Sequence, residues 1–269
     1  MVNLKEKAKW VRKQVLEMCL VAGGGHIAPA LSCTDILVAL YEGDILRVDP
    51  HNLTWEDRDR FILSKGHACA SLYAVLADMG YFPVSKLSTY CQFGTYLGGH
   101  PDSNVLGVEV STGSLGHGLP IGAGMALAAK MDNKDYMTVV LMSDGECQEG
   151  TTWETAMFAA HHHLDNLVAI VDRNGLQAID FTKQVVALEP LEQKWEAFGW
   201  ETRVADGHSF DSLLSTLSDI RSRQSSKPLV VIALTTKGKG ISFMENKVIW
   251  QFGSPVGNEL DQARKELAN

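Results

Sequence analysis

A short polar segment follows an apolar run near the middle of the chain, and its residue types suit ligand binding. Ser143, Asp144 and Gly145 follow the apolar run, and Asn174 follows a second apolar run thirty residues after Asp144. The carboxyl ends of neighbouring parallel strands meet at one edge of a sheet, so we expect Asp144 and Asn174 to lie side by side. A carboxylate and an amide oxygen suit a hard divalent cation such as Mg²⁺, with a phosphate and water completing its shell.

Each of these residues alone more often caps a helix or makes a turn, so the metal-site hypothesis depends on the pair. A helix is predicted over 150–163, directly after the polar segment, and amides at a helix N-terminus favour an anion. Gly145 lets the backbone approach such a ligand closely. The segment therefore predicts a phosphate and metal site at the end of a strand.

The elements that position this site alternate between apolar strands and helices. The length of 269 residues fits one doubly wound α/β domain over 1–269, with 254–269 as its C-terminal tail. A further helix is predicted from Ser32, with Asp35 as its capping-box partner. The alternation implies a mostly parallel sheet with helices on both faces. Strands are predicted over 59–64, 136–142, 166–172, 200–206 and 228–236, and the other helices over 4–21, 66–80, 118–130, 150–163 and 209–222.

Composition excludes several classes of function. The net charge of −8 argues against a nucleic-acid-binding surface. No apolar stretch approaches the length of a membrane span, and the charged N-terminus lacks the apolar core of a signal peptide, so we expect a cytoplasmic protein. The five cysteines are odd in number and form no C-x-x-C pair, which favours free thiols over disulfides or a zinc site.

Five further motifs, in order along the chain, carry a family resemblance. The segment 143–150 with 172–177 resembles the thiamine diphosphate signature, in which Gly-Asp-Gly is followed by Asn, although Ser143 replaces the first glycine. The chain as a whole resembles transketolase over about residues 8–253. The motifs are GGGHIAPALS (23–32), LSKGHA (63–68), GGHP (98–101), STGSLGHGLPIGAGMALA (111–128) and TTKGKGISFMEN (235–246).

The resemblance implies a thiamine-diphosphate-binding domain with a bound Mg²⁺, for which Ca²⁺ or Mn²⁺ are substitutes. It implies that the metal ligands are Asp144, Asn174 and the carbonyl of Leu176. It also implies that the cofactor is contacted by Lys65, His67, Gly113, Ser114, Leu115, Gly145, Glu146, Asn174 and Lys237.

The resemblance implies that His26, His67 and His100 are the catalytic histidines. Histidine moves protons and binds hydroxyl groups near neutral pH, as ketol transfer requires. Structural roles are the default for the remaining histidines considered, and Glu149 is equally suited to capping a helix or reaching a partner subunit. Those histidines are His117, His161, His162, His163 and His208.

Two positions depart from the family pattern. Gln251 stands where the resemblance places the histidine of a Trp-His-Gly sequence, and glutamine binds hydrogen-bond partners but cannot shuttle a proton. Ala178 follows Gln177 where the family usually continues with Ile-Asp-Gly, and its small side chain leaves extra room beside the cofactor. Both departures keep open a specialisation for an unusual sugar, so Gln251 is a substrate-side candidate.

Transketolases are more than twice this length, and they carry a pyrimidine-binding domain and a C-terminal domain that the chain is too short to hold. The resemblance therefore implies the diphosphate-binding subunit of a split transketolase, paired with a separate C-terminal subunit in a heterotetramer. The resemblance also implies that the assembled enzyme transfers a two-carbon unit from a ketose phosphate to an aldose. Two alternatives remain open: the α subunit of another thiamine-diphosphate enzyme, and a non-catalytic binding or regulatory subunit with this fold.

Overall fold

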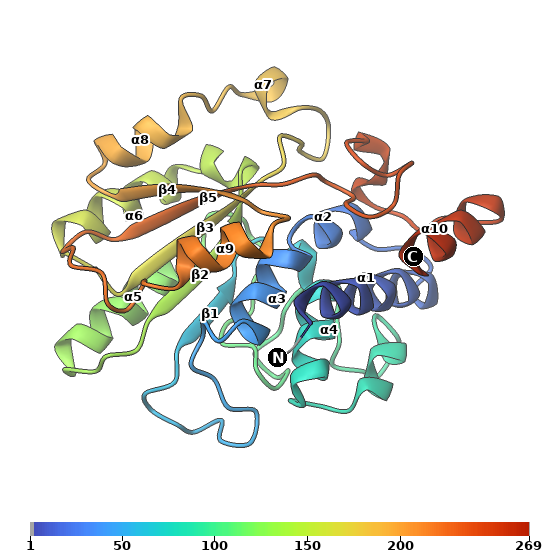
Figure 1. The fold of residues 1–269 in the computed structure, drawn as a ribbon, viewed down its shortest axis with the longest axis horizontal. Coiled ribbons are helices and arrows are strands. Elements are labelled where there is room, and N and C mark those ends of the chain that lie inside the picture. The colour runs from blue at the N-terminus through green and yellow to red at the C-terminus, as the bar shows by residue number, and fades with distance from the viewer. Residues whose placement is uncertain (1–2, 269) are drawn as a thin grey trace.

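A five-stranded parallel sheet forms the centre of the molecule in the computed structural model, which describes residues 3–268 (Figure 1). The strands lie in the order β1-β2-β3-β5-β4, and every neighbouring pair is parallel. All five predicted strands and the predicted α/β fold class are confirmed. The strands are β1 (Arg60–Leu63), β2 (Thr138–Ser143), β3 (Leu167–Arg173), β4 (Glu201–Asp206) and β5 (Leu229–Leu234).

Helices connect the strands and cover the sheet. The longer helices are α1 (Leu4–Val21), α3 (Thr34–Glu42), α4 (Cys69–Met79), α5 (Gly118–Met131), α6 (Gly150–His161), α9 (Phe210–Leu217) and α10 (Asn258–Ala268). The shorter helices are α2 (Ile27–Ser32), α7 (Thr182–Val185) and α8 (Leu191–Ala197), and the 3-10 turns are η1 (Gly66–Ala68), η2 (Val84–Thr89), η3 (Gly145–Gln148) and η4 (Val248–Gln251).

Two hydrophobic clusters, one on each face of the sheet, form the core. Val139 and Leu141 of β2 pack with α1, α3, α4, α9 and α10, whereas Val140 and Met142 of the same strand pack with α5, α6 and α8. Side chains alternate between the two faces of a strand, so an unbroken apolar strand indicates burial on both sides. Helices therefore cover both faces, as predicted.

The two ends of the described chain meet on one side of the sheet. Asn3 caps α1 by accepting a hydrogen bond from the Glu6 amide at 3.3 Å. Figure 1 shows α10, in red, beside α1, in blue, and Arg264 on α10 pairs with Glu17 on α1 at 2.9 Å. The 254–268 segment thus packs against the first helix through α10.

The predicted helix start at Ser32 is wrong. Ser32 is the last residue of α2, and α3 begins at Thr34 without a side-chain cap. The Ser32 hydroxyl donates to the carboxylate of Asp172 at 2.5 Å, and Asp35 pairs with Arg12. Ser32 and Asp35, which the local pattern assigned to a capping box, therefore bind side chains from distant parts of the chain instead. The short helices α7 and α8 were not predicted.

No helix within residues 3–268 has the length and apolar character needed to cross a bilayer. All five cysteines are free, and only Cys91 is exposed. The prediction of free, mostly buried thiols is confirmed.

Candidate functional site

A cavity of about 370 Å³ opens beyond the carboxyl ends of the strands, and we call it the strand-end cavity. Loops that follow β1, β2, β3 and β5 contribute to its wall, as expected for ligand sites on parallel sheets. Its lining residues are His26, Pro29, His67, His100, Gly113, Leu115, Ser143, Asp144, Gly145, Gln148, Glu149, Asn174, Leu176, Gln177, Ala178, Lys237 and Gln251.

Asp144 and Asn174 come together as the sequence predicted, because β2 and β3 are adjacent and Ser143 lies opposite Asp172 in their register. One Asp144 carboxylate oxygen accepts the Gly175 amide at 2.6 Å, and the other accepts the Gly145 amide at 2.7 Å. Burial, followed by the charge of Asp172, raises the pKa of Asp144 to about 6. A cation beside this carboxylate would oppose that shift.

The donor set at this point suits a hard cation. Asp144, Asn174 and the Leu176 carbonyl supply a carboxylate, an amide and a backbone oxygen at one end of the cavity. Within residues 3–268, no three His, Cys, Asp or Glu side chains are grouped to hold a metal ion. A metal here would therefore depend on this mixed set, which contains a single carboxylate.

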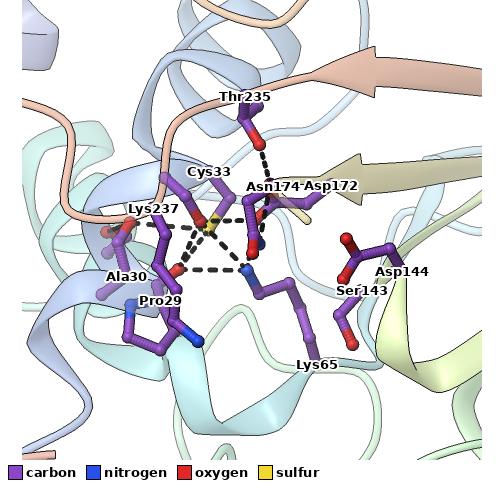
Figure 2. Close-up of polar contacts among 12 residues, drawn as sticks. Pro29, Ala30, Cys33, Lys65, Ser143, Asp144, Asp172, Asn174, Thr235 and Lys237 are labelled. Atoms are coloured by element: carbon purple, nitrogen blue, oxygen red, sulfur yellow. Dashed lines mark hydrogen bonds and ion pairs between the residues drawn. The ribbon is translucent and has the colours of Figure 1, made fainter. Parts of the chain in front are cut away.

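Asp172 does not line the cavity, but it lies beside Asn174 and orients it (Figure 2). The Asn174 side-chain NH₂ donates to an Asp172 oxygen at 3.4 Å, so the Asn174 amide oxygen turns the other way and accepts the Leu176 amide at 3.1 Å. Thr235 also donates to Asp172. Such a second partner commonly fixes the orientation of a metal ligand.

Lys65 is paired with Asp172 and is fully enclosed. The ammonium contacts the Asp172 carboxylate and donates to the Pro29 carbonyl at 3.0 Å, and Lys65 is only 1% exposed. Burial, the largest single cause, would lower the pKa of Lys65, but the charge and hydrogen bond of Asp172, with the charges of Cys33 and Asp144, together outweigh it and raise that pKa. Lys65, which the resemblance implied as a cofactor contact, does not line the cavity, and Figure 2 shows its ammonium directed at Asp172 and Pro29.

The three candidate histidines are grouped in the cavity wall, where the His26 ring packs edge to face with the other two. The His26 ring centroid lies 5.4 Å from that of His67 and 6.1 Å from that of His100. Burial lowers the pKa of His26 and lowers the pKa of His67 well below its usual value, which favours neutral rings. At Gly113 an added Cβ would lie 3.2 Å from the His100 ring, so the missing side chain makes room for that histidine.

Gln251 connects the histidines to Lys237. The His26 Nδ1 lies 3.1 Å from the Gln251 carbonyl, which only accepts, so the proton is on Nδ1 and Nε2 is the acceptor. The Gln251 side-chain oxygen accepts from the Lys237 ammonium. Gly25 and Gly253 exchange two backbone hydrogen bonds, at 3.1 and 2.9 Å, and hold the two loops together.

The Lys237 ammonium also donates to the carbonyls of Leu176 and Gln177, each at 3.2 Å. Burial, followed by the charge of Lys65, lowers the pKa of Lys237 to about 8. The ammonium therefore contacts the Leu176 carbonyl, one of the three oxygen groups assigned to the metal.

Two other predicted residues lie outside the lining. Ser114 is exposed beside the cavity, between Gly113 and Leu115, which do line it. Glu146 is fully buried, and its carboxylate accepts the Gly116 amide at 2.9 Å and the Ser143 amide at 3.3 Å. Burial raises the pKa of Glu146. This carboxylate ties the 113–118 loop to the turn that carries Asp144.

Sequence reasoning missed Asp172, Thr235, Pro29 and Gln148. A charged residue at the end of an apolar strand was a visible signal for Asp172, because buried charges need partners. Glu149, whose role the sequence left open, lines the cavity, as does Ala178. The histidines at 161–163 are exposed at the end of α6 and do not line it.

Residues 4–268 match the family described as "Transketolase, thiamine diphosphate binding domain". One subunit of an apulose-4-phosphate transketolase from Phocaeicola vulgatus is 44% identical over 257 residues, covering 96% of this chain and 91% of that subunit. A 6-deoxy-6-sulfo-D-fructose transketolase subunit from Clostridium sp. is 42% identical over 248 residues, covering 92% of this chain and 90% of that subunit.

The chain spans a smaller share of single-chain transketolases. Human transketolase is 36% identical over 272 residues, and the match covers 98% of this chain but 42% of that protein. The crystal structure of transketolase from Campylobacter jejuni superimposes with a TM-score of 0.91 at 31% identity, covering 98% of this chain and 42% of the other. With the family match over nearly its whole length, the chain belongs to the transketolase thiamine diphosphate binding domain family.

Proposed function

We propose that this chain is the diphosphate- and metal-binding subunit of a two-chain transketolase. In this role it takes part in moving a two-carbon ketol unit from a ketose phosphate to an aldose. The observation that carries the proposal is the strand-end cavity, where the oxygen groups of Asp144, Asn174 and Leu176 share one space with three histidines. Relatives matched over nine-tenths of their length are named as transketolase subunits, which supports the same role.

The cavity suits a metal-bound diphosphate. Asp144, Asn174 and the Leu176 carbonyl would hold Mg²⁺, and Gly145 would admit a diphosphate close to the backbone. The Lys237 ammonium would add positive charge beside it. Thiamine diphosphate, when bound, supplies the carbanion chemistry that cleaves and forms the carbon–carbon bond.

The histidines would handle the sugar hydroxyl groups. His26 donates through Nδ1 to the Gln251 carbonyl, so its Nε2 is left to accept a hydroxyl proton. The lowered pKa values of His26 and His67 keep both rings neutral near neutral pH, so each ring keeps one unprotonated nitrogen that accepts a hydrogen bond from a hydroxyl group. His100 completes this side of the cavity.

A second chain would close the cavity. The chain spans 42% of single-chain transketolases, so the remaining parts would come from a pyrimidine-binding partner. Apolar side chains within two residues of Ala178 or Gln251 along the chain are exposed: Ile179 at 75%, Ile249 at 81% and Phe252 at 62%. A partner would cover this rim, and we propose a heterotetramer with two chains of each kind.

A second candidate of the same class is a transketolase specialised for an unusual sugar. Gln251 and Ala178, the two departures from the family pattern, both line the strand-end cavity. The relatives named above are named for apulose-4-phosphate and 6-deoxy-6-sulfo-D-fructose.

Reconstitution tests the proposal. The chain is mixed with a pyrimidine-binding transketolase subunit from the same organism, with thiamine diphosphate and Mg²⁺, and a panel of ketose donors and aldose acceptors is assayed. Transfer of a two-carbon unit by the pair is expected. A pair that binds the cofactor but transfers no ketol unit from any donor would contradict ketol transfer and favour a regulatory subunit.

A further inference from the structure

Two side chains outside the strand-end cavity form hydrogen bonds with the backbone on either side of Lys237. The Thr236 amide donates to His208 Nε2 at 2.8 Å. On the other side, Arg12 Nε donates to the Lys239 carbonyl at 3.2 Å. Lys237 lies between these two points, and its side chain enters the cavity.

Asp35 links His208 to Arg12. Its carboxylate receives both terminal nitrogens of Arg12, at 3.0 and 2.5 Å, and lies 2.7 Å from His208 Nδ1. Because His208 Nε2 accepts the Thr236 amide, the ring hydrogen is on Nδ1 and donates to Asp35. Arg12 lies on α1, Asp35 on α3, and His208 follows β4, so three distant parts of the chain meet at one short segment.

This network is buried. Arg12 is 9% exposed and Asp35 5% exposed. Burial, the largest single cause, would raise the pKa of Asp35, but the hydrogen bonds and charges of His208 and Arg12 together outweigh it and lower that pKa. The cost of desolvation offsets much of the attraction in a buried ion pair, so such a pair is weak support for a purely stabilising role. What it holds is therefore the more informative feature.

The backbone of residues 236–240 packs closely against the Arg12 side chain. Gly240 has φ +96°, and an added Cβ there would lie 3.1 Å from Arg12 Cδ, so the segment passes directly over the arginine stem. The middle of the segment is bonded to neighbouring backbone only, through the Gly238 amide to the Ala28 carbonyl at 3.0 Å and the Asn246 amide to the Lys237 carbonyl at 2.9 Å. His208 contacts its amino end, and Arg12 contacts its carboxyl end, where Glu245 also accepts the Gly240 amide at 3.1 Å.

We propose that Arg12, Asp35 and His208 are positioning residues that hold the 236–239 segment so that the Lys237 ammonium reaches the cofactor side of the cavity. None of the three lines that cavity. The assignment of Lys237 to the cofactor rests on the proposed function, whereas the role of the three residues in holding the 236–239 backbone does not.

Hydrogen exchange of the full chain without cofactor tests directly whether these residues hold the 236–239 backbone. In His208→Phe the Thr236 amide loses its acceptor, and exchange of a peptide over 236–241 is expected to be about tenfold faster. His208→Gln supplies an acceptor near the place of Nε2 and is expected to restore slow exchange. Unchanged exchange in a folded His208→Phe variant would overturn the proposal.

Calorimetric titration of the complex with its partner measures the consequence. Thiamine diphosphate with Mg²⁺ is expected to bind about tenfold more weakly to the His208→Phe complex, with recovery in His208→Gln. If neither wild type nor variant binds the cofactor, the proposed function fails. The exchange result still decides whether His208 holds the 236–239 backbone.

Two further variants separate positioning from a general loss of stability. Trp200→Phe removes a buried hydrogen bond, from Trp200 Nε1 to the Ala156 carbonyl at 3.0 Å, at the amino end of β4. Its exchange over 236–241 and its cofactor affinity are expected to equal those of wild type, and an equal loss in this variant would overturn the proposal. Arg12→Lys keeps a charge for Asp35 but loses the Nε contact to Lys239, and it decides the same question if His208→Phe does not fold.

Discussion

The ammonium of Lys237 donates to the side-chain oxygen of Gln251, 14 residues further along the chain. A lysine ammonium has no acceptor, so the Gln251 oxygen must face it and the Gln251 NH₂ group must face away. In the described part of the chain, residues 3–268, that NH₂ group donates to no protein atom. The strand-end cavity therefore has a neutral hydrogen-bond donor that does not titrate, where the family pattern has histidine.

Gln251→His tests whether this donor selects the sugar. If the enzyme is specialised, the variant is expected to lower kcat/KM for its own substrate by about tenfold, because a matched hydrogen bond is lost. Pentose phosphates are expected to remain poor substrates. The measurement is the substrate panel on both forms with the partner present. Equal rates for the two forms on every substrate would place position 251 outside the active site.

Asp144→Ala is expected to abolish binding of thiamine diphosphate with Mg²⁺, because the cation loses its one charged protein ligand. Calorimetric titration of the assembled enzyme measures this. Glu149→Gln is the matched control, since Glu149 lines the same cavity and is outside the proposed ligand set. Wild-type affinity in Asp144→Ala would reject the metal assignment.

Lys65→Met leaves the Asp172 carboxylate buried without its cation and is expected to lower the free energy of unfolding by about 3–5 kcal/mol. The loss is expected to shrink as pH falls, because protonation relieves an unpaired buried carboxylate. Urea unfolding at several pH values measures both effects. Adding Asp172→Asn to Lys65→Met is expected to recover part of the stability, and a double variant no more stable than the single one would contradict this account.

Stability is expected to fall in acid partly through His26 and His67, whose pKa values are lowered in the folded chain. Below about pH 6.5 the unfolded chain takes up protons that the folded histidines refuse. Acid therefore favours unfolding, by up to about 1.4 kcal/mol per pH unit for each such histidine. The stability is fully present above this range and is lost as pH falls through it. Urea unfolding from pH 7.5 to 5 measures the slope, and His67→Gln is expected to flatten it. An unchanged slope would argue that His67 is not held neutral.

Without its partner the chain is expected to show little or no ketol transfer and to bind the cofactor weakly, since one side of the cavity would be open to water. With the partner, the cofactor is expected to raise the melting temperature of the complex, as a ligand of the native state does. Thermal unfolding and light scattering of each chain and of the mixture check this, together with the two-to-two stoichiometry. Robust turnover by the chain alone would contradict it.

The pairing of Asp144 with Asn174 could be predicted from the sequence, because it follows from local pattern and one general rule. Apolar strands on either side of a helix must lie in parallel, and their carboxyl ends then meet at the same edge. The five strands and helix α1 were predictable for the same reason, since hydrophobic periodicity is a local property.

Residues whose role depends on distant partners could not be placed in this way. Ser32 has the pattern of a helix cap but binds Asp172, 140 residues away, and His208 was assigned a general structural role although it holds the Thr236 amide. Lys65 lies in a motif that resembles a cofactor contact, yet it is enclosed with Asp172 and does not line the cavity. Local propensity gives these side chains several partners of similar energy. The choice among them is made only when packing brings one buried charge or amide within reach, because an unpaired group would be costly there.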